Sequence, residues 1–118
     1  MEVVDTENGN SVEEVERRDT LWGKFKGLRM ERGRVLMSFR GGSRPVLDMF
    51  LVPEPLELAF IDSSMEIVEV KQARPWTWNP STWSFYRPEE GCSHVLEVER
   101  GLLEEKGFRT GHELEFRD

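Results

Sequence analysis

An aromatic, proline-containing stretch is the part of this sequence whose residue types best suit ligand binding. Residues 72–91 hold five of the chain's twelve aromatic side chains, together with three prolines. An extended backbone would place Trp76 and Trp78 on one face, because side chains alternate along an extended chain. Exposed Trp rings near Arg74 would suit stacking on a sugar, a base or a cation. The alternative is that these rings fold back and plug the end of a small barrel.

A second segment would complete this site. We expect the pocket to lie between Arg74, Trp76 and Trp78 and the strand predicted at residues 46–52, which carries Asp48 and Phe50. Binding there would combine aromatic stacking with one or two charged hydrogen bonds.

Two carboxylates on predicted strands suggest acid–base chemistry. Such chemistry needs two carboxyl groups at a defined separation, with pKa values driven apart by their surroundings. Glu57 and Glu97 each lie opposite the main apolar stripe of their strand. They are candidates for a hydrolase-like enzyme or for the ligand site, and the alternative is a solvated strand face or a structural ion pair.

Cys92 and His94 lie two residues apart, so they share one face of a predicted strand. Such a pair could activate a thiolate or supply two metal ligands. The same face carries Leu96 and Val98, which favours a core-facing Cys and a hydrogen-bonded His. No third ligand follows at a useful spacing, so we predict no metal and no cofactor.

The charge is distributed unevenly. Asp and Glu number 23 against 16 Lys and Arg, and the formal net charge is -7. Residues 24–44 nevertheless hold seven basic residues against Glu31 alone. This segment could bind an anion or pair with the acidic remainder, and overall acidity opposes binding to a phosphate backbone. The anion-binding candidates are Arg29, Arg34, Arg40 and Arg44.

Length and composition indicate one domain that folds without a metal or disulfide. The 118 residues contain one Cys and no apolar stretch near the length of a membrane-spanning helix. Residues 1–18 lack the apolar segment of a secretory signal and read as a mobile acidic tail ahead of a β-rich domain at residues 19–118. A lone Cys fits a reducing compartment, so we expect a cytoplasmic protein with no membrane partner.

The apolar pattern predicts a mainly β, α+β fold. We expect about six strands in a small barrel-like or strongly curled, antiparallel-rich sheet, with one or two short helices. The predicted strands are residues 35–39, 46–52, 56–62, 65–71, 92–99 and 113–117, and the predicted helices are residues 19–26 and 100–106.

Four segments, in order, resemble motifs of a prokaryotic family known as domain of unknown function 192. They are Lys26-Gly27-Leu28-Arg29-Met30, Pro55-Leu56-Glu57-Leu58-Ala59-Phe60-Ile61-Asp62, Val95-Leu96-Glu97-Val98 with Gly101, and Lys106-Gly107-Phe108-Arg109-Thr110-Gly111-His112. Glu57 and His112 each stand where the family has Asp, and Asp48-Met49-Phe50 replaces its Trp-Met-Lys-Asn-Thr. The resemblance implies a compact β-rich fold with an early helix and a short late helix, and it supplies no function.

The sequence therefore favours a non-enzymatic binding or interaction domain that uses its aromatic loop. Its partner would be a small molecule or a protein. The alternatives are an enzyme that uses Glu57 and Glu97, and an anion or nucleic-acid binder through residues 24–44.

Overall fold

The computed structural model describes residues 1–18 and 33–118, and it is built mainly from strands. The predicted helix at residues 19–26 and the candidate Arg29 lie outside the described residues. The mainly β expectation is confirmed. The elements are β1 (Glu2–Asp5), β2 (Ser11–Val12), β3 (Val15–Arg18), β4 (Arg34–Ser43), β5 (Leu47–Asp48), β6 (Leu56–Ile61), β7 (Ile67–Ala73), the 3-10 helix η1 (Pro80–Thr82), β8 (Phe85–Tyr86), β9 (Cys92–Glu99), α2 (Leu102–Lys106) and β10 (Leu114–Arg117).

The described strands form three sheets. A central sheet has the order β3-β4-β9-β6-β7, a smaller one the order β10-β1-β2, and β5 pairs with β8. All pairings are antiparallel except that of β3 with β4. Within residues 1–18 and 33–118 these sheets do not close into a barrel, so the barrel-like part of the prediction is not confirmed.

The central sheet has a hydrophobic core on each face. Along β6, Ala59 and Ile61 belong to one cluster with Leu103 of α2, whereas Leu58 and Phe60 belong to the other. Side chains alternate along a strand, so a strand covered on both faces is buried throughout. All six residues of β6 are buried accordingly.

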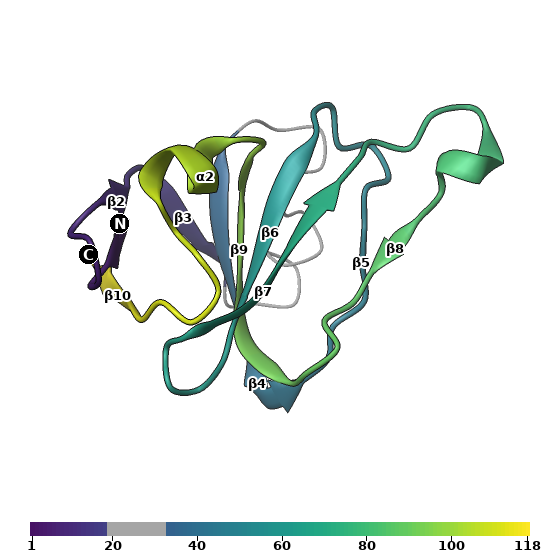
Figure 1. Cartoon of the computed structure of the whole chain (residues 1–118). Coiled ribbons are helices and arrows are strands. Elements are labelled where there is room, and N and C mark those ends of the chain that lie inside the picture. Colours follow the sequence, from purple (N-terminus) through teal and green to yellow (C-terminus); the bar gives the residue numbers. More distant parts are fainter. Residues whose placement is uncertain (19–32) are drawn as a thin grey trace.

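The first 18 residues are part of the fold, unlike the mobile tail that their composition predicts. Val3 and Val12 are fully buried in the core cluster that also contains Leu103 and Leu114. The carboxylate of Asp5 is also fully buried, and it lies 2.7 Å from Nδ1 of His112. β1 pairs with β10, and Figure 1 shows both chain ends on this side of the molecule. Three of the segment's four valines, Val3, Val12 and Val15, belong to this cluster, so a few apolar residues connect the segment to the core.

An arm extends from the other side of the molecule. We call residues 46–52 and 75–86 the aromatic arm. Its strands β5 and β8 run together away from the central sheet, and η1 lies at its outer end (Figure 1). The strand predicted at residues 46–52 is largely wrong, since only Leu47–Asp48 is strand and Phe50 and Leu51 are half exposed.

None of the helices in the described part of the chain combines the length and apolar content needed to cross a membrane.

Candidate aromatic groove

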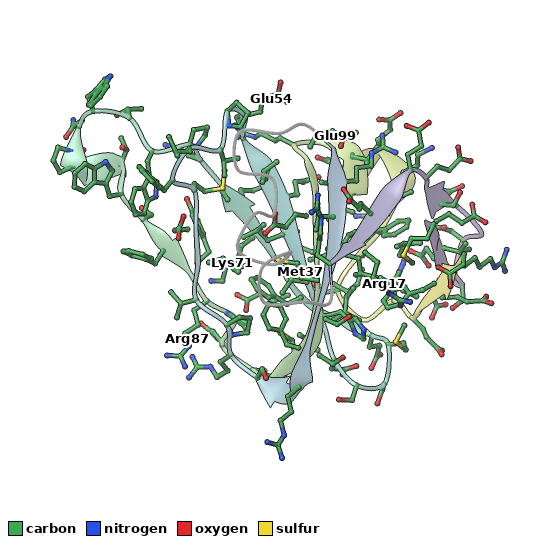
Figure 2. All side chains as sticks on the ribbon, turned by 180° about the vertical axis from the view of Figure 1, so that it is seen from behind. Arg17, Met37, Glu54, Lys71, Arg87 and Glu99 are labelled. Carbon is green, nitrogen blue, oxygen red and sulfur yellow. The ribbon has the colours of Figure 1, made fainter. Side chains whose placement is uncertain are left out.

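The aromatic arm contains an open groove of about 370 Å³. Pockets that bind small molecules start near this size, at roughly 300 Å³. The groove is lined by Phe50, Leu51, Trp76, Thr77, Trp78 and Trp83. Figure 2, seen from behind, shows the side chains of the arm's outer end projecting away from the rest of the molecule.

Trp76 is the centre of the groove's wall. Its ring stacks on Trp83 with centroids 5.7 Å apart and an interplanar angle of 22°. It also meets Phe85 edge-on at 5.3 Å and Phe50 at 6.0 Å. Aromatic pairs in such arrangements each contribute about 0.5–1.5 kcal/mol beyond the area they bury. Because Trp76 also packs against the second core cluster, these rings connect the groove to the folded body.

Hydrogen bonds inside the loop hold these rings in place. The ring N–H of Trp76 donates to the carbonyl of Ser84 at 3.0 Å, and that of Trp83 donates to the carbonyl of Thr77 at 2.9 Å. The side chain of Asn79 caps η1 by accepting from the backbone N–H of Ser81. This is a familiar use of Asn, and it fixes the outer turn.

A strained turn supplies two more of the groove's lining residues, Phe50 and Leu51. The N–H of Val52 donates to the carbonyl of Met49 at 3.2 Å, which closes a turn whose third residue is Leu51. Leu51 has φ of 60°, a left-handed conformation that costs a non-glycine residue on the order of 1 kcal/mol. Asp48 supports the turn, since its Oδ1 accepts from the N–H of Phe50 at 2.9 Å. The strained backbone thus presents Leu51 to the groove.

The plug interpretation does not describe the outer rings. Trp78 is 100% exposed and Trp83 is 48% exposed. Every large hydrophobic side chain that is exposed among the described residues lies on the aromatic arm: Val46, Phe50, Leu51, Trp78, Trp83 and Phe85. Four of them, Phe50, Leu51, Trp78 and Trp83, line the groove, and exposed apolar surface gathered in one place is the kind that marks interaction sites.

The groove brings together only part of the predicted site. Phe50, Trp76 and Trp78 line it, whereas Arg74 and Asp48 are not among its lining residues. The backbone N–H of Arg74 donates to the hydroxyl of Tyr86 at 3.1 Å, at the base of the arm. Sequence reasoning missed Leu51, Thr77 and Trp83 as lining residues. Trp83 could have been found, because it lies in the same aromatic stretch.

The two candidate carboxylates lie on opposite faces of the central sheet. Glu57 is paired with Val98 of the first core cluster, whereas Glu97 is paired with Leu58 of the second. Paired residues of an antiparallel ladder point to the same face. The two carboxylates therefore share no cleft. This excludes a mechanism in which Glu57 and Glu97 act together as acid and base.

Glu57 has a structural position instead. Its side chain is buried, and Oε1 accepts from the N–H of Leu103 at 3.0 Å while Oε2 accepts from the amide of Gln72 at 2.7 Å. The N–H of Leu103 belongs to the first turn of α2, where backbone donors lack partners within the helix. Glu97 is also buried, and it makes at least one hydrogen bond, ion pair or other electrostatic contact.

Cys92 and His94 do not form a catalytic pair, because their side chains have different surroundings. Cys92 is fully buried in the second core cluster, and burial raises the pKa of its thiol to about 11. The ring of His94 lies edge-on to Phe116, which packs against the first cluster, and its Nδ1 is 2.9 Å from Oγ of Ser93. A thiol with so high a pKa is a poor nucleophile. Within the described ranges, no three His, Cys, Asp or Glu side chains are grouped to hold a metal ion.

Arg34, Arg40 and Arg44, the basic residues of the segment that the structure describes, have separate surroundings. Arg34 makes a two-point contact with Glu99, with N–O distances of 2.6 and 3.0 Å, and it also donates to the carbonyl of Glu13. Arg40 lies six residues further along β4, roughly 20 Å away at the rise of a strand. Arg44 donates to the carbonyl of Pro88 at 2.9 Å. The ion pair of Arg34 agrees with the interpretation that basic residues pair with the acidic remainder.

These observations define a mainly β protein that carries an exposed aromatic groove on a projecting arm. The chain belongs to the DUF192 family, described as "Uncharacterized ACR", whose model matches residues 3–116. The resemblance drawn from the four sequence segments is thereby confirmed.

Relatives of this chain are likewise named without a function. A UPF0127 protein of Thermococcus sibiricus is 28% identical over 103 residues, which span 83% of this chain and 62% of the relative. The chain thus covers less than two thirds of that relative's length. A crystal structure of a protein of unknown function from Novosphingobium aromaticivorans has a TM-score of 0.78 at 19% identity, covering 98% of this chain and 82% of that one.

A second solved structure shares the fold. This Sinorhizobium meliloti protein, provisionally named a transcription regulator, has a TM-score of 0.77 at 20% identity, with 97% of this chain and 89% of that one covered. At these identities both likenesses concern the fold alone.

Proposed function

We propose that this protein is a non-enzymatic binding module that holds an uncharged, apolar or aromatic partner in the groove of the aromatic arm. The observation that carries the proposal is the exposure of Trp78, Trp83 and Phe50 around one groove. Exposed aromatic surface is costly in water, and a partner that covers it gains the free energy of burial, about 25 cal/mol per Å². The loop's own hydrogen bonds lower the entropy lost on binding.

The alternatives have less support. An enzyme built on Glu57 and Glu97 would need both carboxylates at one cleft, and they lie on opposite faces. A nucleic-acid binder would need clustered free cations, and Arg34 is engaged with Glu99. The buried, unpaired Cys92 supports our proposal that the protein works in the reducing cytoplasm.

Nile red, an uncharged dye whose emission rises in apolar surroundings, tests the groove. We expect saturable binding to the intact chain and at least tenfold weaker binding to Trp78→Ala. The thermal midpoint of this variant should stay within about 2 °C of the parent, because removing a fully exposed ring changes stability by at most ~0.5 kcal/mol.

Val46→Ala is the matched control. Val46 is an exposed apolar residue of the arm that does not line the groove, so its loss should leave dye binding unchanged. Equal dye affinity for the parent and Trp78→Ala would contradict the proposal, as would the absence of saturable binding.

A further inference from the structure

The groove has a distinctive hydrogen-bonding character. The ring N–H groups of Trp76 and Trp83 are both used by backbone carbonyls of the loop. The hydroxyl of Thr77 accepts from the N–H of Asn79 and lies 3.2 Å from the hydroxyl of Thr82. Trp78 makes no hydrogen bond within the described part of the chain, so its exposed ring N–H is available to a partner. The groove therefore offers apolar faces and one ring donor.

The groove is also uncharged. None of the six lining residues carries a charge, in a chain of which 33% is charged, and the one charged residue of the aromatic arm, Asp48, accepts with Oδ1 from the N–H of Phe50. A phosphate, a nucleotide or a strongly acidic or basic peptide would lose hydration there without gaining an opposite charge. Charge complementarity thus favours an uncharged partner. A sugar is disfavoured as well, because its many hydroxyls would meet few free hydrogen-bonding side chains.

We propose that the groove binds a proline-rich polypeptide segment in the polyproline II conformation. This inference rests on the proposed function and names the partner class. Such a segment has no internal hydrogen bonds, and proline has no backbone N–H that would need an acceptor in the groove. Its rings pack on aromatic faces, and a carbonyl between them can accept from Trp78. Its extended shape is preformed, so binding costs little chain entropy.

The size of the site agrees with a short segment. Polyproline II rises 3.1 Å per residue with three residues per turn, so one turn is roughly 9 Å long. The centroid of Trp76 lies 6.0 Å from that of Phe50 and 5.7 Å from that of Trp83, distances shorter than one such turn. We expect a groove of about 370 Å³, lined by Trp76 and Trp78, to hold about one turn of the segment.

The test is a calorimetric titration of the intact chain with an end-blocked ten-residue proline peptide. An end-blocked (Gly-Ser)₅ peptide of equal length and zero charge is the control. We expect the proline peptide to bind and the Gly-Ser peptide to bind at least tenfold more weakly. Equal affinity for the two peptides would overturn the inference.

Two variants of Trp78 test the contributions of its ring and of its ring N–H to binding. Trp78→Ala should weaken proline-peptide binding at least tenfold, and Trp78→Phe, which keeps a ring but has no donor, should weaken it by a smaller factor. Val46→Ala should leave it unchanged. Circular dichroism of each variant establishes that the fold is intact. Loss of binding in Val46→Ala, or its retention in Trp78→Ala, would overturn the inference.

Other occupants give different results. If Nile red binds through Trp78 but the proline peptide does not bind, the partner class is wrong and the proposed function stands. If neither binds, both proposals fail. Trp78-dependent dimerisation in analytical ultracentrifugation would assign the arm to a second copy of the chain. Trp78-dependent binding to vesicles of phosphatidylcholine, which has no net charge, would assign it to lipid. Either result would overturn the inference.

Discussion

Glu57 provides the sharpest test of whether a candidate catalytic acid is instead structural. Its two oxygens accept from the N–H of Leu103, at 3.0 Å, and from the amide of Gln72, at 2.7 Å. Both hydrogen bonds connect β6 to its neighbours, the first to α2 and the second to β7. Glu57→Leu keeps the apolar volume but removes both acceptors, whereas Glu57→Gln keeps one of them.

The expected magnitude follows from the contacts. Leaving the buried N–H of Leu103 without an acceptor costs about 1–3 kcal/mol, and the charged bond to Gln72 contributes about 1.5 kcal/mol more. Glu57→Leu should therefore lower the free energy of unfolding by about 3 kcal/mol. For a domain of this size that corresponds to roughly 10 °C in the thermal midpoint. Glu57→Gln should cost about 1 kcal/mol, because its amide oxygen still accepts from Leu103 and the exposed Gln72 can reorient.

Urea unfolding followed by circular dichroism measures these differences. Glu104→Gln is the matched control, since Glu104 is an exposed carboxylate of α2 and its loss should change stability by less than about 0.5 kcal/mol. Nile red binding should be unchanged in Glu57→Gln, because Glu57 is not among the groove's lining residues. A Glu57→Leu variant as stable as the parent would refute the structural role. A fully stable Glu57→Gln variant that had lost ligand binding would show that Glu57 serves the function.

Three further predictions test the N-terminal strands, the thiol and the ion pair. Val3→Ala should lower the free energy of unfolding in urea by about 2 kcal/mol, because Val3 is fully buried. Glu7→Ala, at an exposed position, should change it by almost nothing, and equal effects of the two variants would favour a mobile tail. Cys92 should react slowly with Ellman's reagent at pH 8 in the native protein, since burial raises its pKa to about 11, and fully in denaturant; rapid native labelling would contradict that burial. The hydrogen bond from Arg34 lowers the pKa of Glu99 below 4.5, so the pair's contribution is present above pH 4.5 and is lost as pH falls through the folded-state value. Arg34→Ala should thus lose about 0.5 kcal/mol from the ion pair at pH 7, a small amount because the pair is partly exposed. The loss should become smaller in strong acid, where only the hydrogen bond to the carbonyl of Glu13 remains, and a difference independent of pH would speak against the ion pair.

The central strands could be predicted because their signal is local. The apolar pattern of residues 56–61 and 92–99 marks strands whatever their partners, and β6 and β9 appear there. The turn after β6 follows from Asp62, whose Oδ1 accepts from the N–H groups of Ser64 and Glu66. Such hydrogen bonds span a few residues, so residue type alone predicts them.

The N-terminal strands could not be predicted in the same way. Residues 1–18 contain four valines among many acidic and polar residues, a composition typical of a solvated tail. Val3 and Val12 are buried because β1 and β2 pair with each other and β1 with distant β10. That pairing joins the two ends of the chain, so no local window of sequence contains it.

The candidate groove also has some features that the sequence predicts and others that depend on the tertiary structure. The concentration of Trp and Phe in residues 76–86, and the absence of charge there, are properties of the sequence alone. Whether those rings form a plug or a groove depends on how the loop leaves the sheet. Leu47, its partner Tyr86 and Trp76 pack against the second core cluster, whereas Trp78 is fully exposed.

The sequence by itself therefore determined the mainly β class, the family, the places of the central strands and the aromatic residues that line most of the groove. The tertiary structure alone decided that Glu57 and Glu97 face opposite sides, that Leu51 joins the groove and that Arg34 is held by Glu99. The physical reason is that alternation along a strand is a local property, whereas the register between strands and the path of a loop depend on contacts between residues far apart in the chain.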